Sequence, residues 1–310
     1  MKDFEEILIR VKELNTNVTI RKAELQDAHL FVTLFNQNYT RKTNISYFEW
    51  QFFNPNFPSA LFLAFESGEL IGFYGVKVYD VLTIGKVAFA IDFLIHENAR
   101  KKGVAILLEQ YVREFCINNH VHSITALPNS NGNAAFSALG YKSLSKIDTL
   151  IYDLSLSNPI CSLVKDEKIS IDASFSFSKD INYLDWRFNQ NPIYSYDFVF
   201  LNENCYAYIK VFIDPVTKKS CGDIVHLQAA TIQNAFSLIN LCIEKVKQQG
   251  IQWITIWALP HSTLYQHLIY AGFMQQEHQR YFCLRVVKES DLNQLEFSKW
   301  QLDECDAEIY

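Results

Sequence analysis

The sequence predicts an α/β fold in which two similar domains, each built from a mixed sheet and flanking helices, follow one another along the chain. The main observation is an internal repeat, because the segment 47–52 (YFEWQF) is echoed at 183–188 (YLDWRF), with an Asn-Pro pair after both copies. Two further pairs of segments match at an offset of 132 residues: 126–128 with 258–260, and 140–141 with 272–273. An ordered series of matches at a nearly constant offset is typical of a duplicated domain. The length of 310 residues and the hydrophobic fraction of 49% also suit two domains with sizeable cores.

The elements of the first half can be read in order from its apolar pattern. Residues 17–23 predict a short strand, 24–36 a helix, and 47–53 a second helix that stops before the Asn-Pro pair. Two apolar strands at 60–66 and 70–79 are joined by a Ser-Gly turn. The remaining expected elements are a long strand 87–95, a helix of about 16 residues from Gly103, a strand 122–126, a short helix before Gly140 and a last strand to Asp153.

The same order recurs from Tyr183 onward, which sets the expected domain limits. The first domain is predicted at 1–153 and the second at 168–290, with a shortened opening strand and helix. Ser, Asn, Pro and Asp between them predict a linker at 154–167. Residues 291–310 carry charge and little pattern, so we expect a tail.

Composition argues against several classes of protein. The net charge of −6 and the pI near 5.8 disfavour a nucleic-acid-binding surface. Seven cysteines without paired spacing predict reduced thiols rather than disulfides or a metal site. The first 17 residues form a charged amphipathic pattern, and no apolar run approaches the roughly 20 residues that span a bilayer. We therefore expect a cytoplasmic protein without metal, membrane insertion or a nucleic-acid partner. The sequence predicts no oligomeric state.

The segment 90–105 (AIDFLIHENARKKGVA) carries the clearest chemical signal. An apolar strand ends, a short turn contains Arg100, Lys101, Lys102 and Gly103, and a helix begins. The first N–H groups of a helix lack intrahelical partners, and the helix dipole favours an anion there. Glycine allows a phosphate to approach the backbone closely. This turn suits a pyrophosphate, although solvated turns of similar composition are common.

The segment resembles motif A of the GNAT superfamily of N-acetyltransferases, with Arg-x-x-Gly-x-Ala at the start of the central helix. The order of elements across the first half also resembles this family, up to a motif B helix that ends in Leu139-Gly140-Tyr141. The resemblance implies two GNAT-like domains, each with a mostly antiparallel twisted sheet and a splayed central strand. It implies acetyl-CoA or another acyl-CoA as co-substrate, with the pantetheine along the central strand and the pyrophosphate on the turn. The residues that it implies in binding are Phe93, Leu94, Ile95, Arg100, Lys101, Lys102, Gly103, Val104, Ala105, Ile106 and Asn129.

Two residues depart from the family pattern. Members often have a tyrosine four residues before the motif B glycine, where it protonates the leaving thiolate, and this chain has Phe136. Another group or water then supplies the proton, or the step needs none, because a thiolate is a good leaving group. Ala105 stands in place of the last glycine of motif A, which the family tolerates.

Asp92 is the candidate general base, since it is a lone acid within an apolar strand beside the implied thioester position. Burial would raise its pKa and make it a better base. The alternative is a structural acid at a strand kink, satisfied by the backbone or by Arg100. His96 is a second, weaker candidate. Tyr47 and Glu49 could bind substrate, but their counterparts Tyr183 and Asp185 recur in the second half, which favours a packing or capping role.

The corresponding turn of the second half, 228–236 (QAATIQNAF), contains neither glycine nor a basic residue. We therefore expect this half to have kept the fold and lost the cofactor site. For the whole chain, the resemblance implies acyl transfer by direct attack of the amine on the thioester. We expect the acceptor to be a primary amine on a small molecule, such as an amino sugar or an amino acid. Two alternatives stay open: a Fem-type peptidyltransferase that uses aminoacyl-tRNA, and a non-catalytic acyl-CoA sensor.

Overall fold

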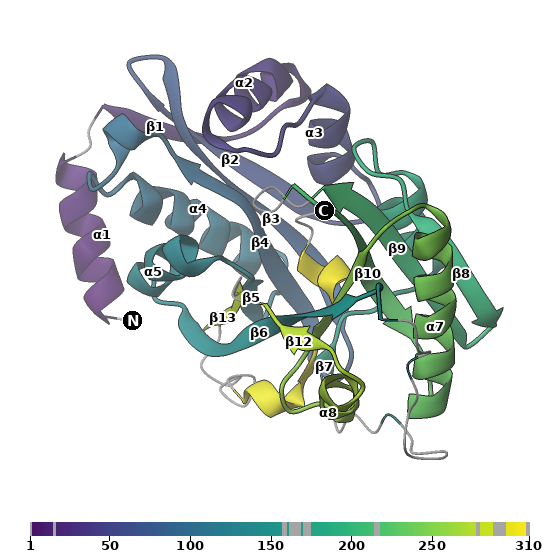
Figure 1. The fold of residues 1–310 in the computed structure, drawn as a ribbon. Coiled ribbons are helices and arrows are strands. Elements are labelled where there is room, and N and C mark those ends of the chain that lie inside the picture. Colours follow the sequence, from purple (N-terminus) through teal and green to yellow (C-terminus); the bar gives the residue numbers. More distant parts are fainter. Residues whose placement is uncertain are drawn as a thin grey trace. The chain divides into compact units, whose positions relative to one another are not determined.

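The computed structural model describes residues 2–14, 17–156, 160, 169, 175–213, 218–276, 280–287 and 296–307. These residues form two compact units. Unit 1 contains residues 1–145, 190–193 and 281–297, and unit 2 contains 146–189, 194–280 and 298–310. Each unit has the predicted mixed sheet with flanking helices (Figure 1). Most of the expected linker 154–167 lies outside the described residues.

The sheet of unit 1 follows the expected strands closely. Its order is β1 (Val18–Lys22), β2 (Ser59–Glu66), β3 (Glu69–Val81), β4 (Gly85–Ile95), β5 (Ser123–Ala126) and β13 (Arg280–Val286). Neighbours are antiparallel except β4 and β5, which are parallel. The β2–β3 turn places Ser67 and Gly68 at φ of 53° and 85°, as a tight hairpin requires.

Helices cover both faces of this sheet (Figure 1). The helices of unit 1 are α1 (Lys2–Leu14), α2 (Ala28–Asn38), α3 (Ile45–Phe52), α4 (Val104–Asn118) and α5 (Ser130–Ala138). Alternation along the strands separates the two layers. On one face Phe62 of β2 packs against the rings of Tyr111 and Phe115 in α4. On the other, Phe73 of β3 meets Phe31 of α2 at a ring-centroid distance of 4.9 Å.

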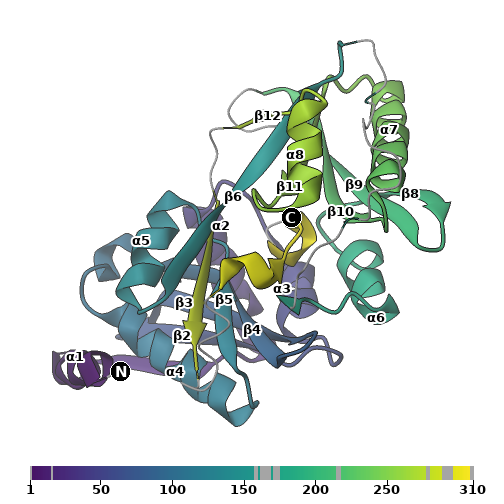
Figure 2. The same ribbon diagram turned by 90° about the horizontal axis from the view of Figure 1, so that it is seen from below.

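The sheet of unit 2 repeats the same plan (Figure 2). Its order is β6 (Lys142–Asp153), β11 (Trp253–Ala258), β10 (Ser220–Gln228), β9 (Cys205–Ile213) and β8 (Asp197–Asn202), with β10 and β11 parallel. The short β12 (Met274–Gln275) pairs with β6. The main helix, α7 (Ile232–Gln248), packs on β8, β9 and β10. The other helices are α6 (Ile181–Leu184), which continues into a π turn at Asp185–Asn189, and α8 (Thr263–Tyr270).

The two repeats exchange their last strands. β13, which the repeat assigns to the second half, pairs with β5 in unit 1, with Cys283 opposite Ala126 and Val286 opposite Ser123. β6, which it assigns to the first half, pairs with β11 in unit 2 through residues 148–153. The compact units therefore do not follow the expected limit at 153: the chain enters unit 2 at Lys146, and residues 281–297 complete unit 1.

The expectation of a tail at 291–310 is wrong for the residues that the structure describes there. β14 (Trp300–Gln301) pairs in parallel with β7 (Phe175–Ser176), and short 3-10 turns lie at Phe297–Lys299 and Glu304–Ala307. Trp300, Leu302 and Cys305 are buried in unit 2. Single buried residues anchor this segment, so its sequence has no helical or strand periodicity. A sequence without periodicity resembles that of a tail.

Six cysteines lie in the described residues, and all are buried and free of disulfides, as expected. None of the helices in the described part of the chain has the length and apolar character needed to cross a membrane.

A buried polar chain links α4 to the exchanged strand β13. Arg285 of β13 donates to Glu109 of α4 (Nη1 to Oε1, 2.9 Å) and to the backbone carbonyl of Leu139. Tyr141 donates to the other oxygen of Glu109 at 3.4 Å and contacts the hydroxyl of Tyr74 at 2.9 Å. Burial raises the pKa of Glu109 to about 7, against the opposing effect of Arg285.

We predict that Glu109 makes the stability of the chain depend on pH. A carboxyl whose folded pKa is raised contributes stability that is present below its unfolded pKa and is lost as pH rises through its folded pKa. Unfolding by urea should therefore show stability falling between about pH 4.5 and about pH 7.5. Glu109→Gln should flatten this dependence, whereas the exposed Glu114→Gln on the same helix should not. A dependence that survives in Glu109→Gln would assign it to other groups.

The strand exchange predicts that the first repeat cannot fold alone. A fragment of residues 1–153 lacks β13, so β5 loses its antiparallel neighbour and Glu109 loses Arg285. Leaving a buried acid without its partner is strongly destabilising. We expect this fragment to show no cooperative thermal unfolding by circular dichroism. Joining residues 280–287 to its end through a flexible linker should restore a transition; cooperative unfolding of the unmodified fragment would contradict the prediction.

Candidate functional site

The site begins where β4 and β5 separate. The two strands pair at only three positions, Val87 with Ser123, Ala88 with Ile124 and Phe89 with Thr125. β4 continues to Ile95, whereas β5 ends at Ala126. Parallel strands that pair at one end only leave a wedge-shaped gap between them at the other end. This wedge between β4 and β5 lies within unit 1.

A bulge in β4 lies at the mouth of this wedge. Ile91 pairs with Gly75 and Leu94 with Phe73, so Asp92 and Phe93 together stand opposite Tyr74. Asp92 has a φ of 44°, a left-handed conformation that side chains other than glycine seldom adopt. Gly75 is required here because a Cβ on it would lie 2.6 Å from the ring of Phe52 in α3. The bulge turns the end of β4 away from its neighbour.

The turn after β4 leads into α4 as the sequence predicted. Gly103 is the N-cap of α4 at a φ of 86° and offers no side chain to the first helical N–H groups. A Cβ on Gly103 would lie 2.5 Å from Cγ1 of Val11, because α1 packs against α4 at this point. The exposed side chains of Arg100, Lys101 and Lys102 surround the turn. The backbone and the charges together favour an anion.

A cavity of about 1010 Å³ lies in the wedge, entirely within unit 1. Its volume is at the upper end of the roughly 300–1,000 Å³ typical of small-molecule sites. One wall is the end of β4 and the turn, and the opposite wall is one face of α5 with Asn131, Ala135 and Ala138. Asn38 and Tyr39, at the end of α2, and Val11 and Glu66 complete it.

The cavity collects nearly all the residues that the motif resemblance implied. Its lining includes Phe93, Leu94, Ile95, Arg100, Lys101, Lys102, Gly103, Val104, Ala105 and Ile106. Asn129 is the exception: it is the N-cap of α5, and its side chain accepts from the N–H of Gly132 at 2.9 Å. Asn131 and Gly132 line the cavity in its place.

Asp92 is not among the lining residues, and both of its carboxylate oxygens have partners. Arg41 donates to Oδ1 at 3.0 Å, and the hydroxyl of Tyr47 donates to Oδ2 at 2.8 Å. The guanidinium of Arg41 also lies over the rings of Phe35 and Tyr47. Burial raises the pKa of Asp92, and Arg41 opposes this shift. The partner of the acid is therefore Arg41 rather than Arg100, whose Nε donates to the carbonyl of Ile95.

The other candidates have local structural contacts. The ring of His96 accepts from the N–H of Asn98 and caps the turn Glu97–Ala99. Tyr47 is buried, in keeping with a packing role, and Glu49 is exposed. Phe136 is also buried and packs edge-on against Tyr141.

Sequence reasoning missed Tyr39. Its hydroxyl donates to the carbonyl of Phe93 at 2.7 Å, so it joins the end of α2 to the bulge. Burial raises its pKa well above the ordinary value, which keeps the phenol protonated. No motif marks it, because it lies 54 residues from its partner. The small residues of α5 had a detectable signal, since Asn131, Ala135 and Ala138 share one helical face.

Unit 2 contains the same divergence with a different turn. β10 and β11 pair from Cys221 with Trp253 to Ile224 with Ile256 and then separate. The helix that follows, α7, is capped by the side chain of Thr231, which accepts from the N–H of Asn234. In unit 2 a side chain thus caps the first N–H groups of the helix, whereas Gly103 leaves the corresponding groups of α4 in unit 1 uncapped.

The comparisons with known proteins agree with this geometry. Residues 26–141 match the profile of the acetyltransferase (GNAT) family. A tandem GNAT protein from the clavulanic acid biosynthesis pathway superimposes with a TM-score of 0.50 at 11% identity, over 87% of this chain and 99% of that one. The chain has the fold of a tandem GNAT protein.

Two other solved structures resemble this chain over most of its length. One is a conserved protein of unknown function, a probable N-acyltransferase, from Enterococcus faecalis V583 (TM-score 0.63, 12% identity, 89% of this chain and 74% of that one). The other is a GCN5-related N-acetyltransferase from Anabaena variabilis ATCC 29413 (TM-score 0.64, 11% identity, 88% and 74%). A search of curated proteins finds none that matches the sequence. At these identities the structures show the shared fold, so the predicted fold class is confirmed.

Asp92→Asn tests whether the acid holds the bulge. Without the carboxylate, Arg41 keeps a buried charge with a weaker partner, so we expect a loss of about 1–3 kcal/mol in the free energy of unfolding. Asp80→Asn, at an exposed position on β3, should change stability little. Loss of turnover by Asp92→Asn with unchanged stability would instead support its predicted role as the base.

Proposed function

We propose that the first unit of this GNAT protein binds an acyl-CoA, most simply acetyl-CoA, and transfers the acyl group to a primary amine on a small molecule. The observation that carries the proposal is the cavity of about 1010 Å³ that runs from the bulge of β4 to the basic turn before α4. It combines an elongated apolar wall with an anion-binding end, which suits a cofactor that has a long arm and a pyrophosphate.

Ligand recognition would be divided along the cavity. The open N-terminus of α4 and the side chains of Arg100, Lys101 and Lys102 would hold the phosphates. The backbone of β4 from Phe93 to Ile95 would pair with the amide groups of the pantetheine arm, as a strand neighbour does. The small side chains of Ala135 and Ala138 on α5 leave room for that arm. The acyl group would then lie at the bulge.

Tyr39 is the group that we propose stabilises the departing thiolate. The transfer forms a carbon–nitrogen bond, breaks the carbon–sulfur bond and leaves a thiolate, while the amine gives a proton to water or to a base. Phe136 has no proton to donate, but Tyr39 lines the cavity, and its hydroxyl donates to the carbonyl of Phe93 at the bulge. If this hydroxyl turned from that carbonyl to the departing sulfur, its hydrogen bond would lower the energy of the developing charge.

The base is less well supported than the cofactor site. The raised pKa of Asp92 is what a base requires, whereas Arg41 and Tyr47 already occupy its two oxygens and favour a structural role. Asp92 as the base therefore stays a prediction, as does the choice of an amino sugar or an amino acid as acceptor.

Calorimetric titration with acetyl-CoA tests the cofactor site directly. We expect saturable binding with one site per chain, and Gly103→Glu should weaken it by about 100-fold or more, which is about 2.7 kcal/mol. The substituted side chain would meet Val11, adopt an unfavourable positive φ and bring a negative charge to the phosphates. Gly68→Glu is the matched control, because Gly68 also has a positive φ but faces open space in a hairpin turn.

Absence of acetyl-CoA binding by the unmodified protein would overturn the proposal. If binding is observed, release of free thiol with a panel of primary amines separates an enzyme from an acyl-CoA sensor. Binding without thiol release from any amine would favour the sensor.

A further inference from the structure

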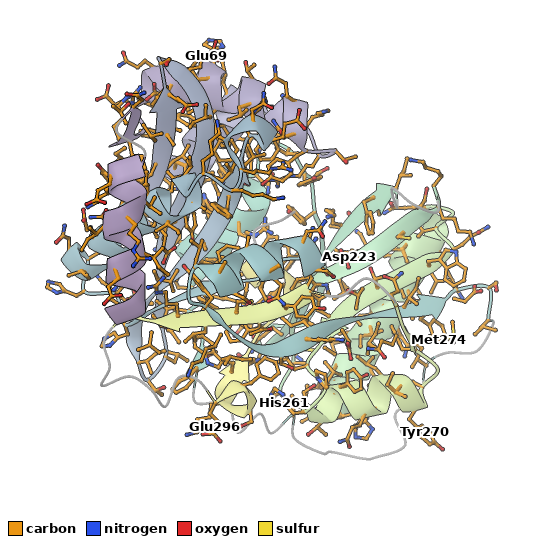
Figure 3. The ribbon with its side chains drawn as sticks, turned by 90° about the vertical axis from the view of Figure 1, so that its left-hand side faces the viewer. Glu69, Asp223, His261, Tyr270, Met274 and Glu296 are labelled. Carbon is orange, nitrogen blue, oxygen red and sulfur yellow. The ribbon has the colours of Figure 1, made fainter. Side chains whose placement is uncertain are left out.

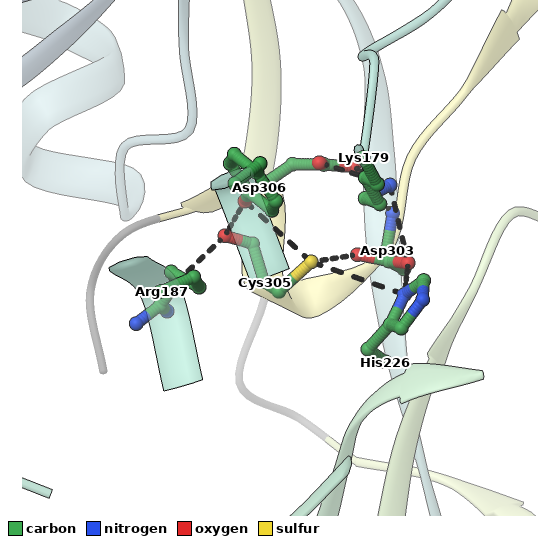
Figure 4. Close-up of polar contacts among 7 residues, drawn as sticks. Lys179, Arg187, His226, Asp303, Cys305 and Asp306 are labelled. Carbon is green, nitrogen blue, oxygen red and sulfur yellow. Dashed lines mark hydrogen bonds and ion pairs between the residues drawn. The ribbon is translucent and has the colours of Figure 1, made fainter. Parts of the chain in front are cut away.

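The C-terminal turn of unit 2 brings together a set of side chains that the proposed transferase reaction does not use. The segment 300–307 lies against β10, and its side chains meet His226 from that strand and Lys179 from the segment before α6 (Figure 4). All of these residues belong to unit 2. His226 and Cys305 are buried, with 2% and 0% of their surface exposed.

Three different donor types converge in this cluster. Nδ1 of His226 lies 2.6 Å from Oδ2 of Asp303, and Sγ of Cys305 lies 2.8 Å from Oδ1 of the same carboxylate. Sγ and Nδ1 are 4.0 Å apart. Imidazole, carboxylate and thiol groups are the side chains from which proteins build zinc sites. Donors at about 2.0–2.3 Å from a tetrahedral ion lie roughly 3.2–3.7 Å from one another. One donor atom from each of these three residues lies within 4.8 Å of the other two.

We propose that His226, Asp303 and Cys305 bind a divalent transition-metal ion of the zinc class. On binding, Cys305 releases its thiol proton to solvent, and Nδ1 of His226 gives up the proton that it shares with Asp303, so that the neutral ring carries its proton on Nε2 and binds through the lone pair of Nδ1. Asp303 binds through one carboxylate oxygen. Lys179 acts as a positioning residue, because its ammonium group lies 3.2 Å from Oδ2 of Asp303 and 3.1 Å from Oδ1 of Asp306. Such outer partners orient metal-binding carboxylates.

The charges of the cluster favour a bound cation. Asp303, Asp306 and, in the bound form, the Cys305 thiolate carry negative charge, whereas Lys179 and Arg187 supply positive charge, the latter from a guanidinium that donates to the backbone carbonyl of Cys305. A bound cation would offset the remaining negative charge of these buried groups. Within the described residues Nε2 of His226 is buried without a hydrogen-bond partner. The contacts seen for this ring therefore leave one of its nitrogens unsatisfied.

A pocket gives the cluster an approach from solvent. This pocket, of about 280 Å³, lies where β10 and β11 diverge, and Asp303 lines it together with Gln228, His261 and Ser262. His261 precedes α8, as its label in Figure 3 shows, with Tyr270 at the other end of that helix. The side chain of Asp303 is 23% exposed, more than that of His226. Three protein ligands beside a pocket leave a fourth coordination position for water or a small ligand, the arrangement of catalytic rather than structural zinc sites.

No sequence motif marks this site, and the spacing of the cysteines predicted that no metal would be bound. His226 and Asp303 are 77 residues apart, and no ligand pair has the short spacing of a zinc motif. Cys305, the proposed thiolate ligand, lies in the segment 291–310 that was expected to be a tail. The proposal is independent of the acyl-CoA site, which lies in unit 1.

Metal content and cobalt spectroscopy test the proposal. The full chain, purified without chelator and with zinc in the medium, should contain about one zinc ion per chain by mass spectrometry. Replacement with Co²⁺ should produce a thiolate-to-cobalt charge-transfer band in the near ultraviolet. Cys305→Ser should abolish this band, and His226→Gln should lower the metal content severalfold. Cys242→Ser, which removes another buried thiol of unit 2, should retain both signals.

Lys179→Met separates the positioning role from ligation, since it should weaken zinc binding by about 10-fold or more and keep the charge-transfer band.

If the variants fail to fold, X-ray absorption of the unmodified zinc protein tests the ligand set instead. One sulfur at about 2.3 Å from the metal and nitrogen or oxygen at about 2.0–2.2 Å are expected. Full chain that takes up no metal from added Zn²⁺ or Co²⁺ would overturn the proposal, as would bound metal without a sulfur ligand. Loss of acetyl-CoA binding alone would not affect it.

Discussion

Because β4 pairs with β5 at only three positions, the last part of β4 runs free of its parallel neighbour, and the features of the first unit follow from this separation. The bulge at Asp92 and Phe93 turns the strand away, and Gly75 permits it by admitting Phe52. The strand then delivers the chain to the basic turn, and Gly103 opens α4 toward the wedge. Had β5 paired along the whole of β4, there would be no cavity, and the charges of the turn would surround only solvent.

Unit 2 has the same separation of parallel strands, but different residues border the gap. β10 and β11 also diverge, but Thr231 caps the following helix, and Leu302 and Asp303 of the C-terminal segment line the space between the strands. In unit 1 a basic turn borders the gap between the diverging strands, whereas in unit 2 the C-terminal segment borders it. Unit 2 has a threonine-capped helix in place of an open one, and it contains a cluster of histidine, carboxylate and thiol groups.

The repeat, the order of elements and the turn at 100–106 could be predicted from the sequence, because each depends on local pattern. Ten of the eleven expected cofactor residues line one cavity for the same reason: they fall within one short segment, 93–106. Asn129 was misplaced because an asparagine before a helix serves equally well as its N-cap. Tyr39, the pairing of Arg41 with Asp92 and the cluster around Asp303 join residues 50 or more positions apart, and no periodicity reports such contacts.

The exchanged strands also constrain the order of events during synthesis. β5 is made early, but its antiparallel neighbour β13 comes more than 150 residues later, since Cys283 pairs with Ala126. A ribosome working at about 5–20 residues per second therefore leaves that edge of the first sheet uncovered for roughly ten to thirty seconds. Open strand edges are where nascent chains associate wrongly, with one another or with the wrong copy of a repeat. The first unit thus depends for its completion on the half of the chain that follows it from the ribosome, which gives selection a reason to retain the second repeat.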